Sequence, residues 1–481
     1  MTQAEKAWVK RREVLNEAYS PKLLRLGGVC ERLVYFHDRY SSFFSSGVHD
    51  LSEVSRHYFH GLFQSGKKNM ERIEEVVCGS VYENLQNFVS DSPWQERPLL
   101  TQIGKDANNL LGGQEASCLL LDESGFPKKG TKSVGVKRQW CGEVGKVENC
   151  QVGVFMSLCR GNNAVPINYR LFLPQDWTDD QARCYNAKIP LMHQEYKSKH
   201  QLALEMVVEA RQNNLSYNWI GADGFYGEST WLLRQLDDLG EIFLIDVHKS
   251  QHVYLQDPKP IVPSNESKVE KVGRKFTRLR SQTDSVGVDK YVSQQPESSW
   301  QKMVTRDSTK GELEVEILHA QVWLWDSKLQ EKEGHLWHLV VRREANAPDT
   351  IKYSLSNAPP DTSLERLAYM QAQRYWIERT FQDAKNECGM GDYQVRSWTG
   401  WHHHMAMVLL AMLFMTEERL LHKESIKLLS CTDIVQLLKT ILPRRDITVA
   451  EVLRQIKIRH KKRQSSIDSA RRKRKQKEKR E

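Results

Sequence analysis

The 481 residues are 40% hydrophobic and 27% charged, which is typical of a soluble globular protein with a substantial core. The longest strongly apolar run (405–415) is too short for a membrane span, and residues 1–15 lack the apolar core of a signal peptide. The nine Cys include no CxxC pair, which argues against a disulfide framework or a zinc ribbon. Without a membrane span or a signal peptide, we expect a cytoplasmic protein. The net charge of +9 is concentrated from Arg454 onward, where there are 14 Lys and Arg but only three acids, so we expect a disordered basic tail (471–480) that either binds polyanions or only aids solubility.

Residues 1 to about 105 are predicted to be helical. Apolar residues recur three or four positions apart in 50–64 and in 70–89, and SGKKN (65–69) joins the two segments by a short turn. Two helices joined in this way form either a DNA-binding unit or an ordinary helical hairpin. The pattern alone favours the hairpin.

From residue 116 the hydrophobic period changes to that of strands. Short apolar runs predict strands at 116–122, 133–140, 149–159, 169–174, 217–223 and 242–247, and an amphipathic helix at 198–212. Residues 248–352 are polar and rich in strand-like runs. Helices are expected again from 363 to about 425, and at 433–442 and 448–458. The chain is therefore predicted to be an α/β protein with helical ends.

Two acids, Asp122 and Asp223, each end a predicted buried strand and precede a Gly-containing loop. In open α/β sheets, functional groups gather at the carboxyl ends of strands, and a buried carboxylate is costly unless it binds a cation. Two such carboxylates offer the hard oxygen ligands that Mg²⁺ or Mn²⁺ prefers. Each Asp could instead only cap the following turn, and the sequence leaves both interpretations open.

Three further acids lie in the predicted helix RYWIERTFQDAKNEC. At about 100° per residue, Arg374, Glu378 and Lys385 share one face beside the apolar stripe, whereas Asp383 and Glu387 point towards solvent. Glu378 is therefore the candidate third metal ligand, with two cations beside it that suit a phosphate backbone. The alternative is a plain i,i+4 salt bridge between Arg374 and Glu378.

Three segments resemble bacterial insertion-sequence transposases of the DDE class, in particular the family numbered seven hundred and one, a relative of family four. The segments are LLLDESGFPKKGTKSVGVKRQWCGEVGKVENCQVGV, NWIGADGFYG and RYWIERTFQDAKNECGMGDYQVRSWTGWHHHMAM, and the resemblance spans about residues 20 to 425. It implies a ribonuclease H-like mixed sheet flanked by helices, with Asp122, Asp223 and Glu378 as the catalytic and metal-binding triad. It also implies two Mg²⁺ ions per site, replaceable by Mn²⁺, and cut-and-paste hydrolysis and strand transfer of transposon-end DNA.

The same resemblance implies double-stranded DNA as the partner, both at terminal inverted repeats and at the target. It further implies a homodimer at synapsis, no membrane association, and a place in the bacterial cytoplasm with nucleoid association on DNA. The predicted phosphate contacts are Arg374 and Lys385, together with Lys128, Lys129 and Lys132 after the first Asp.

Relatives can stack a Trp of the β-rich insertion on a flipped base, and Trp323, Trp325 and Trp337 are the candidates here, with core packing as the alternative. Relatives in family four also carry a Tyr-x2-Arg-x3-Glu-x6-Lys signature. This chain keeps the Arg, Glu and Lys spacing but has Gln371 at the Tyr position. Hairpin formation that depends on that Tyr therefore does not carry over.

Five regions are expected from these patterns. They are a helical N-terminal DNA-binding domain (1–105), the first part of the catalytic core (106–247), the β-rich insertion (248–352), the second part of the core with the Glu helix (353–425), and a helical C-terminal region with the basic tail (426–481). The alternative functions are a non-catalytic DNA-binding protein derived from a transposase and another ribonuclease H-like nuclease. The intact set of three acids favours the transposase.

Overall fold

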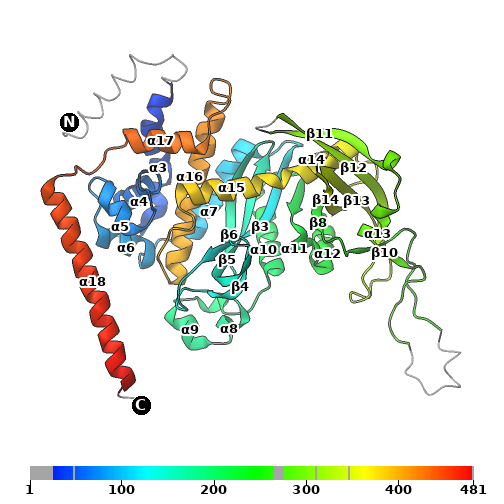
Figure 1. The fold of residues 1–481 in the computed structure, drawn as a ribbon, viewed down its shortest axis with the longest axis horizontal. Helices are drawn as coiled ribbons and strands as arrows, with labels where there is room; N and C mark the ends of the chain where they lie inside the picture. Colours follow the sequence, from blue (N-terminus) through cyan, green and yellow to red (C-terminus); the bar gives the residue numbers. More distant parts are fainter. Residues whose placement is uncertain (1–24, 47–48, 265–275, 309–310, 345–346, 479–481) are drawn as a thin grey trace. The chain divides into compact units, whose positions relative to one another are not determined.

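The chain divides into two compact units in a computed structural model that describes residues 25–46, 49–264, 276–308, 311–344 and 347–478 (Figure 1). The first unit comprises Met1–Gln95, Lys385–Val395 and Glu418–Glu481, and the second comprises Glu96–Ala384 and Arg396–Glu417. Residues 1–24 of the predicted N-terminal domain and the last three residues of the predicted tail lie outside the described residues. No helix in the described ranges is both long and apolar enough to cross a bilayer.

Helices dominate the first unit, because apolar residues recur at helical spacing along its segments. Its core is aromatic: Phe88 stacks on Trp94 with ring centroids 5.3 Å apart, and Phe36 stacks on Phe59 at 6.0 Å. The elements are η1 (Arg25–Gly28), α3 (Val29–Tyr40), η2 (Ser41–Phe44), β1 (Ser45–Ser46), β2 (His49–Asp50), α4 (Ser52–Gln64), α5 (Met70–Val76), α6 (Tyr82–Ser90), α17 (Cys431–Ile441) and α18 (Val449–Glu478).

The predicted helical pair at 50–64 and 70–89 is present, but its second helix is split into α5 and α6. The break contains Gly79 at φ 77°, a conformation that Gly adopts at little cost. The glutamates of α5 pair with the basic helix α18: Arg454 with Glu74, at 2.5 Å, and Lys462 with Glu71, at 2.9 Å. An acidic helix paired in this way is unsuited to contact phosphates, which favours the ordinary hairpin.

The basic tail is helical as far as Glu478, where we expected disorder from residue 471. No Gly or Pro interrupts residues 444–481, and Lys, Arg and Gln are good helix formers. Its described side chains beyond residue 470 are exposed. The predicted solvation of the tail therefore agrees with the structure, whereas the predicted disorder was wrong for the described part.

A mixed 12-stranded sheet forms the second unit, in the order β10-β9-β12-β13-β14-β8-β7-β3-β5-β4, with β6 beside β5 and β11 beside β12. β3 pairs antiparallel with β5 and parallel with β7, which pairs parallel with β8. This arrangement is that of a ribonuclease H-like core, and the predicted fold class is confirmed. The strands are β3 (Ser117–Pro127), β4 (Lys137–Cys141), β5 (Lys146–Arg160), β6 (Asn163–Leu171), β7 (Trp219–Ala222), β8 (Phe243–Val247), β9 (His252–Tyr254), β10 (Ser285–Gly287), β11 (Gln301–Ser308), β12 (Gly311–Leu324), β13 (His335–Glu344) and β14 (Ala347–Ser356).

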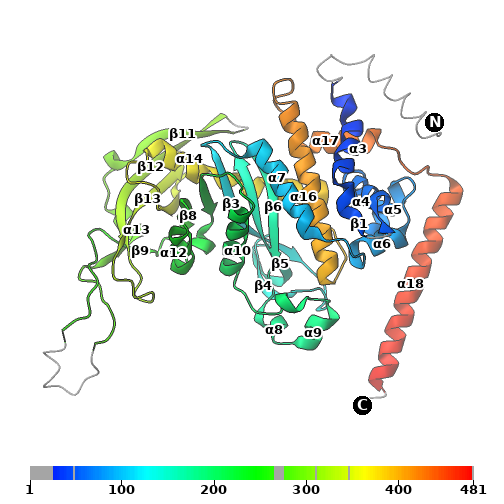
Figure 2. The same cartoon turned by 180° about the vertical axis from the view of Figure 1, so that it is seen from behind.

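Helices cover both faces of this sheet. Figure 1 shows α14 and α15 in front of the sheet, and Figure 2, from behind, shows α7, α10 and α12 on the opposite face. The helices are α7 (Glu96–Leu111), α8 (Gln175–Thr178), α9 (Gln181–Asn186), η3 (Leu191–His193), α10 (Lys199–Gln212), α11 (Gly224–Gly227), α12 (Thr230–Asp238), α13 (Val288–Ser293), η5 (Glu297–Ser299), α14 (Leu364–Gln373), α15 (Tyr375–Cys388) and α16 (Trp398–Leu421).

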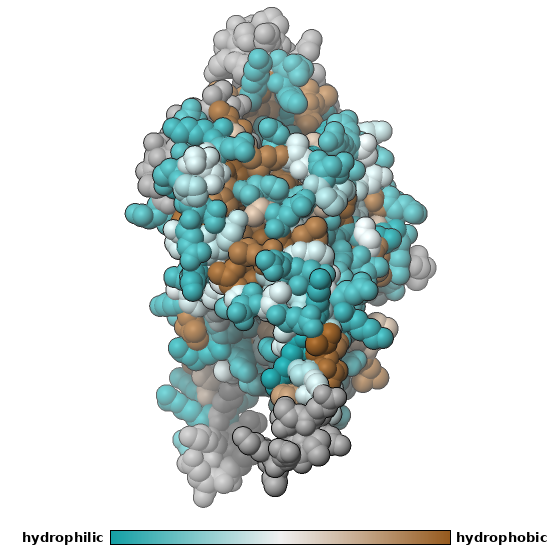
Figure 3. Space-filling model, turned by 90° about the vertical axis from the view of Figure 1, so that its right-hand side faces the viewer, coloured by the Kyte–Doolittle hydropathy of each residue, from teal (hydrophilic) through white to brown (hydrophobic). Residues whose placement is uncertain are grey.

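The β-rich insertion continues the core sheet, because β14 pairs with β8. Its described residues form strands β9 to β14 and no long helix, as its sequence pattern predicts. Figure 3, a view from the side of the insertion, shows apolar residues in the middle of that face, with hydrophilic residues around them. Leu255, Val304 and Leu336 are among the exposed apolar side chains of the insertion. One face of an antiparallel sheet can remain open to solvent in this way.

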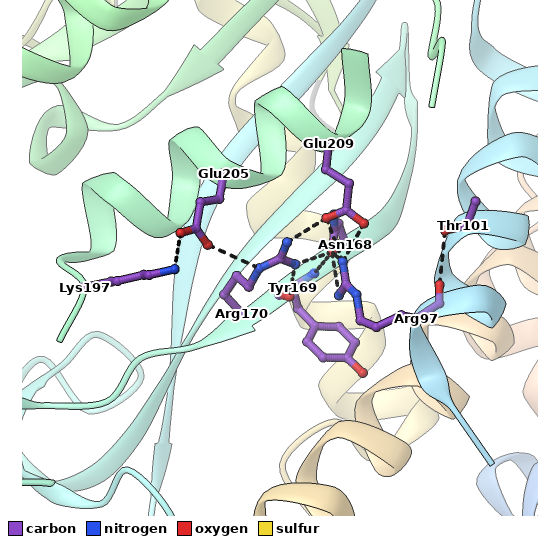
Figure 4. Close-up of polar contacts among 8 residues, drawn as sticks. All are labelled: Arg97, Thr101, Asn168, Tyr169, Arg170, Lys197, Glu205 and Glu209. Atoms are coloured by element: carbon purple, nitrogen blue, oxygen red, sulfur yellow. Dashed lines mark hydrogen bonds and ion pairs between the residues drawn. The ribbon is translucent and has the colours of Figure 1, made fainter. Parts of the chain in front are cut away.

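A half-buried ionic network links α7 and α10 to edge strand β6. The second unit begins at Glu96 and includes α7, whereas we expected the N-terminal domain to reach residue 105. Arg97 and Arg170 both donate to Glu209, at 2.6 Å each, and Asn168 donates to it at 3.1 Å (Figure 4). Arg170 and Arg97 also line a cavity of about 310 Å³. Because both guanidiniums are already paired, the network is a structural device that holds helices to the sheet edge.

Candidate active site

Three aspartates lie in one row across the parallel strands of the core. In β3, β7 and β8, the residue that follows the last position paired between parallel strands is Asp122, Asp223 and Asp246, respectively. Residues in register on parallel strands project to the same face, so the three carboxylates share one level of the sheet. The predicted neighbours Asp122 and Asp223 are brought together here, and Asp246 is a third acid that we did not predict.

Asp122 lies inside its strand, whereas we expected it at the strand end. β3 continues to Pro127 because it remains paired with β5, where Asp122 lies opposite Phe155. Asp223 follows β7 directly and caps α11, since its Oδ1 accepts a hydrogen bond from the Phe225 backbone N–H at 3.1 Å. Asp223 therefore does cap the following turn, which was one of the two interpretations that we left open. The cap uses only one of its two carboxylate oxygens.

Arg374 brings the acids of the sheet and of the helix together. It lies at the junction between α14 and α15, and its Nε is 3.0 Å from Asp246 Oδ2. Its Nη1 is 2.8 Å from Glu378 Oε1, so the predicted i,i+4 pair is also present. Arg374 and Glu378, at the start of α15, therefore face the three aspartates of the sheet.

Burial and mutual repulsion dominate the electrostatics of this cluster. Burial, and then the charge of Asp223, raise the pKa of Asp122 well above its usual range, although Arg374 opposes both effects. Burial also raises the pKa of Asp223, again against Arg374. Burial by itself lowers the pKa of Arg374, but the charges of Asp246 and Glu378, and then those of the other two aspartates, outweigh it and raise that pKa. The Arg374 guanidinium is the positive charge that offsets the repulsion among these carboxylates.

The exposure of the helix acids differs from our expectation. The Glu378 side chain is 51% exposed, whereas Asp383, expected in solvent, is buried and pairs with Arg379 at 3.0 Å. Glu387 accepts a hydrogen bond from the Thr432 hydroxyl at 2.8 Å. The position of a residue on the helical wheel therefore did not predict its exposure: Glu378 is exposed, whereas Asp383, on another face of α15, is buried.

The predicted phosphate contacts fall in different places. The loop after β3 is held by Asn149, whose side-chain amide donates to the carbonyls of Lys128, at 2.6 Å, and Gly130, at 2.8 Å. Lys129 and Lys132 on this loop are exposed. Lys385 belongs to the first unit, although it is on the same helix as Glu378.

Two of the three candidate Trp residues are core residues. Trp325 is buried and its indole N–H donates to the Glu331 carbonyl at 2.8 Å, and Trp337 is buried edge-on against Phe243. Neither side chain is available to stack on a base in this structure, so core packing, the alternative that we gave for these residues, describes them. Trp323 is half-buried and keeps its candidacy.

A buried phenol lies beside the carboxylates. The Tyr226 hydroxyl has no hydrogen-bond partner among the residues that the structure describes, and its pKa is raised by burial and then by the charges of Glu123, Asp122 and Asp223. Glu123 itself projects away from Asp122 and pairs with Lys199 at 2.8 Å, as strand alternation predicts.

Replacing Tyr226 with Phe is expected to raise the free energy of unfolding by about 1 kcal/mol, because it removes a buried hydroxyl that lacks a partner. Tyr217→Phe is the matched control: its hydroxyl donates to Glu241 at 2.8 Å, so this change should lower stability by a similar amount. Denaturant titration of the metal-free protein measures both. A loss of stability in Tyr226→Phe would mean that the hydroxyl is bonded in solution.

The donor set suits a hard divalent cation. Asp122, Asp223 and Glu378 supply only carboxylate oxygens, and a cation would relieve the repulsion that raises the first two pKa values. Among the described residues, no three Asp, Glu, His or Cys side chains are already grouped closely enough to hold a metal ion. Glu378 would have to leave Arg374 to become a ligand.

Comparison with known proteins gives two matches. A family model described as a DDE superfamily endonuclease matches residues 37–312, more than half of the chain. A protein of Microchaete diplosiphon, named as a probable transposase for insertion sequence element IS701, is 23% identical over 368 residues, 75% of this chain and 82% of that protein. The predicted resemblance is confirmed. The family match includes Asp122 and Asp223 and ends before Glu378.

Proposed function

Because this chain belongs to the DDE superfamily of endonucleases, we propose that it is a transposase that cuts transposon-end DNA and joins it to a target. The observation that carries the proposal is the pair of carboxylates at one level of the sheet, buried Asp122 and half-buried Asp223, with Glu378 facing them from α15. The relative named as a probable insertion-sequence transposase supports the same function.

In this proposal Asp122, Asp223 and Glu378 hold two Mg²⁺ ions, for which Mn²⁺ would substitute. When bound, such ions supply a nucleophilic oxygen at neutral pH and stabilise the leaving oxygen of the phosphodiester. The protein's own contribution is to place the two aspartates at one level of the sheet, with the positive charge of Arg374 beside them to oppose the rise of their pKa values. Glu378, which is half exposed, can turn from Arg374 towards the aspartates without unpacking the helix.

Double-stranded DNA is the proposed partner, at terminal inverted repeats and at the target. The N-terminal helical region would recognise the ends, the basic helix α18 would add salt-dependent affinity, and a homodimer would hold two ends together. Acidic α5 is excluded as the recognition element by its own charge, so the contacts would come from other helices of that region.

The test uses the unaltered protein with Mg²⁺ or Mn²⁺ and DNA that carries the inverted repeats flanking its gene. The expected result is metal-dependent strand cleavage at the repeat end and joining of the 3′ end to a target plasmid, both abolished by a chelator. Binding without cleavage would instead support a non-catalytic protein derived from a transposase. Cleavage that depends on DNA shape and ignores the repeats would support another ribonuclease H-like nuclease.

The exposed loop after β3 gives a second prediction. Replacing both Lys129 and Lys132 with Ala should weaken binding to all DNA sequences alike and lower the slope of log affinity against log salt by about two, because each Lys neutralises about one phosphate. Lys439→Ala, outside the second unit, is the control for a general charge effect. Filter binding between 50 and 200 mM salt measures the slope. An unchanged slope would remove the loop from the DNA interface.

A further inference from the structure

We propose that Asp246 is a positioning residue for this reaction, which acts through Arg374 and a relay of buried hydrogen bonds. The inference rests on the proposed function, and it concerns an acid outside the predicted triad. Asp246 holds the third place in the aspartate row, which would also suit a metal ligand. Its contacts decide between the two roles.

Both oxygens of the Asp246 carboxylate are already bonded. Oδ2 forms an ion pair with Arg374 Nε at 3.0 Å, and Oδ1 accepts a hydrogen bond from the Ser354 hydroxyl at 2.6 Å. Ser354 is fully buried and lies directly opposite Asp246 in the β14–β8 ladder, so the sheet itself fixes this bond. A carboxylate with a partner at each oxygen is better suited to hold its neighbours in place than to bind a metal ion.

The relay continues to the residue that departs from the family signature. Gln371, which is buried at the end of α14, donates from Nε2 to Ser354 Oγ at 2.7 Å. The chain of contacts therefore runs Gln371, Ser354, Asp246, Arg374, Glu378. It ties the last turn of α14 to the sheet just before Arg374, where the helical pattern is interrupted and α15 begins.

This arrangement gives Arg374 two partners of different character. The Asp246 side chain is 15% exposed and anchored, whereas the Glu378 side chain is 51% exposed and held only at the rim. If Glu378 left the guanidinium to hold a metal ion, the ion pair between Arg374 Nε and Asp246 would remain. Asp246 would thus keep the Arg374 guanidinium beside the aspartates after Glu378 had turned away.

The test compares Asp246→Asn with Ser354→Ala, which removes one bond of the relay without changing charge. At saturating Mn²⁺, Asp246→Asn should slow end cleavage by about tenfold to a hundredfold, and Ser354→Ala by several-fold, with DNA affinity close to wild type at a temperature at which both variants are folded. In an Arg374→Gln background, Asp246→Asn should cause no further slowing, because its effect passes through that guanidinium.

Three outcomes would overturn the inference. Wild-type rates for both variants would show that the relay is only structural. Multiplied losses in the double variant would show that Asp246 acts independently, as a metal ligand does. If the unaltered protein does not cleave end DNA, the proposed function is wrong and this inference fails with it. If the unaltered protein and Asp246→Asn cleave equally well, only the inference is wrong. If Asp246→Asn does not fold, Ser354→Ala still decides the first case.

Discussion

Cleavage of transposon-end DNA is expected to fall by about a thousandfold or more when Glu378 is replaced with Gln. A metal ion contributes several kcal/mol of transition-state stabilisation, and each 1.36 kcal/mol is a factor of ten in rate. Gln is the same size and keeps a hydrogen-bonding oxygen for Arg374, but it cannot supply a negatively charged ligand. DNA binding and folding should remain, because the Glu378 side chain is half exposed and its loss leaves no buried group without a partner.

The matched control is Glu387→Gln on the same helix. Its carboxylate accepts a hydrogen bond from Thr432, belongs to the first unit, and has no place in the aspartate row. Cleavage by this variant should stay within a few-fold of wild type under the same Mn²⁺ and DNA concentrations. Full activity in Glu378→Gln would remove Glu378 from the site, and an equal loss in Glu387→Gln would place the catalytic acid on the wrong face of α15.

The adjacency of Asp122 and Asp223 could be predicted from sequence because it follows from strand topology. Two buried strands that run parallel place the residues after their paired segments side by side, whichever loops follow. The length of β3 could not be predicted in the same way. Its extension beyond Asp122 depends on antiparallel pairing with β5, and the run ESGFP that forms it carries no apolar alternation.

Asp246 escaped prediction for a related reason. The run IFLIDV predicts a strand, but its Asp is one residue from the strand end, and only the pairing with β7 shows that it is level with Asp223. The exposure of α15 could not be derived either, since the helical wheel gives directions but not what lies in each direction. Asp383 is buried because the chain packs around that side of the helix, and its charge is met by Arg379.

Loss of the Arg374 guanidinium should be the largest single effect on stability in the core. Arg374→Gln is expected to lower the free energy of unfolding of the metal-free protein by about 3 kcal/mol at neutral pH, since removing one partner of a buried charge cluster leaves the other charges uncompensated. Lys137→Gln is the control in the same unit: it breaks one ion pair, with Asp176, in which the two side chains are 41% and 61% exposed, and it should cost at most about 0.5 kcal/mol.

The deficit in Arg374→Gln should shrink as the pH falls. The folded protein holds protons on Asp122 and Asp223 more tightly than the unfolded chain does, because their folded pKa values are raised. Stability therefore increases as the pH falls through these raised pKa values, and it stops increasing below the ordinary carboxyl pKa. Without the opposing charge of Arg374 both pKa values rise further, so the variant gains more than the wild type over the same interval.

Two changes should each restore part of the stability that Arg374→Gln loses: the addition of Mn²⁺ and a second substitution at Asp122. Mn²⁺ should raise the unfolding midpoint of Arg374→Gln more than that of the wild type, because the ion then meets carboxylates with no competing cation. Adding Asp122→Asn to Arg374→Gln should recover part of the lost stability, since it removes the carboxylate whose burial and repulsion are strongest. Thermal melts of the four proteins of this cycle, with and without Mn²⁺, measure both effects. Additive losses in the double variant would show that Arg374 does not stabilise the protein through the aspartate row.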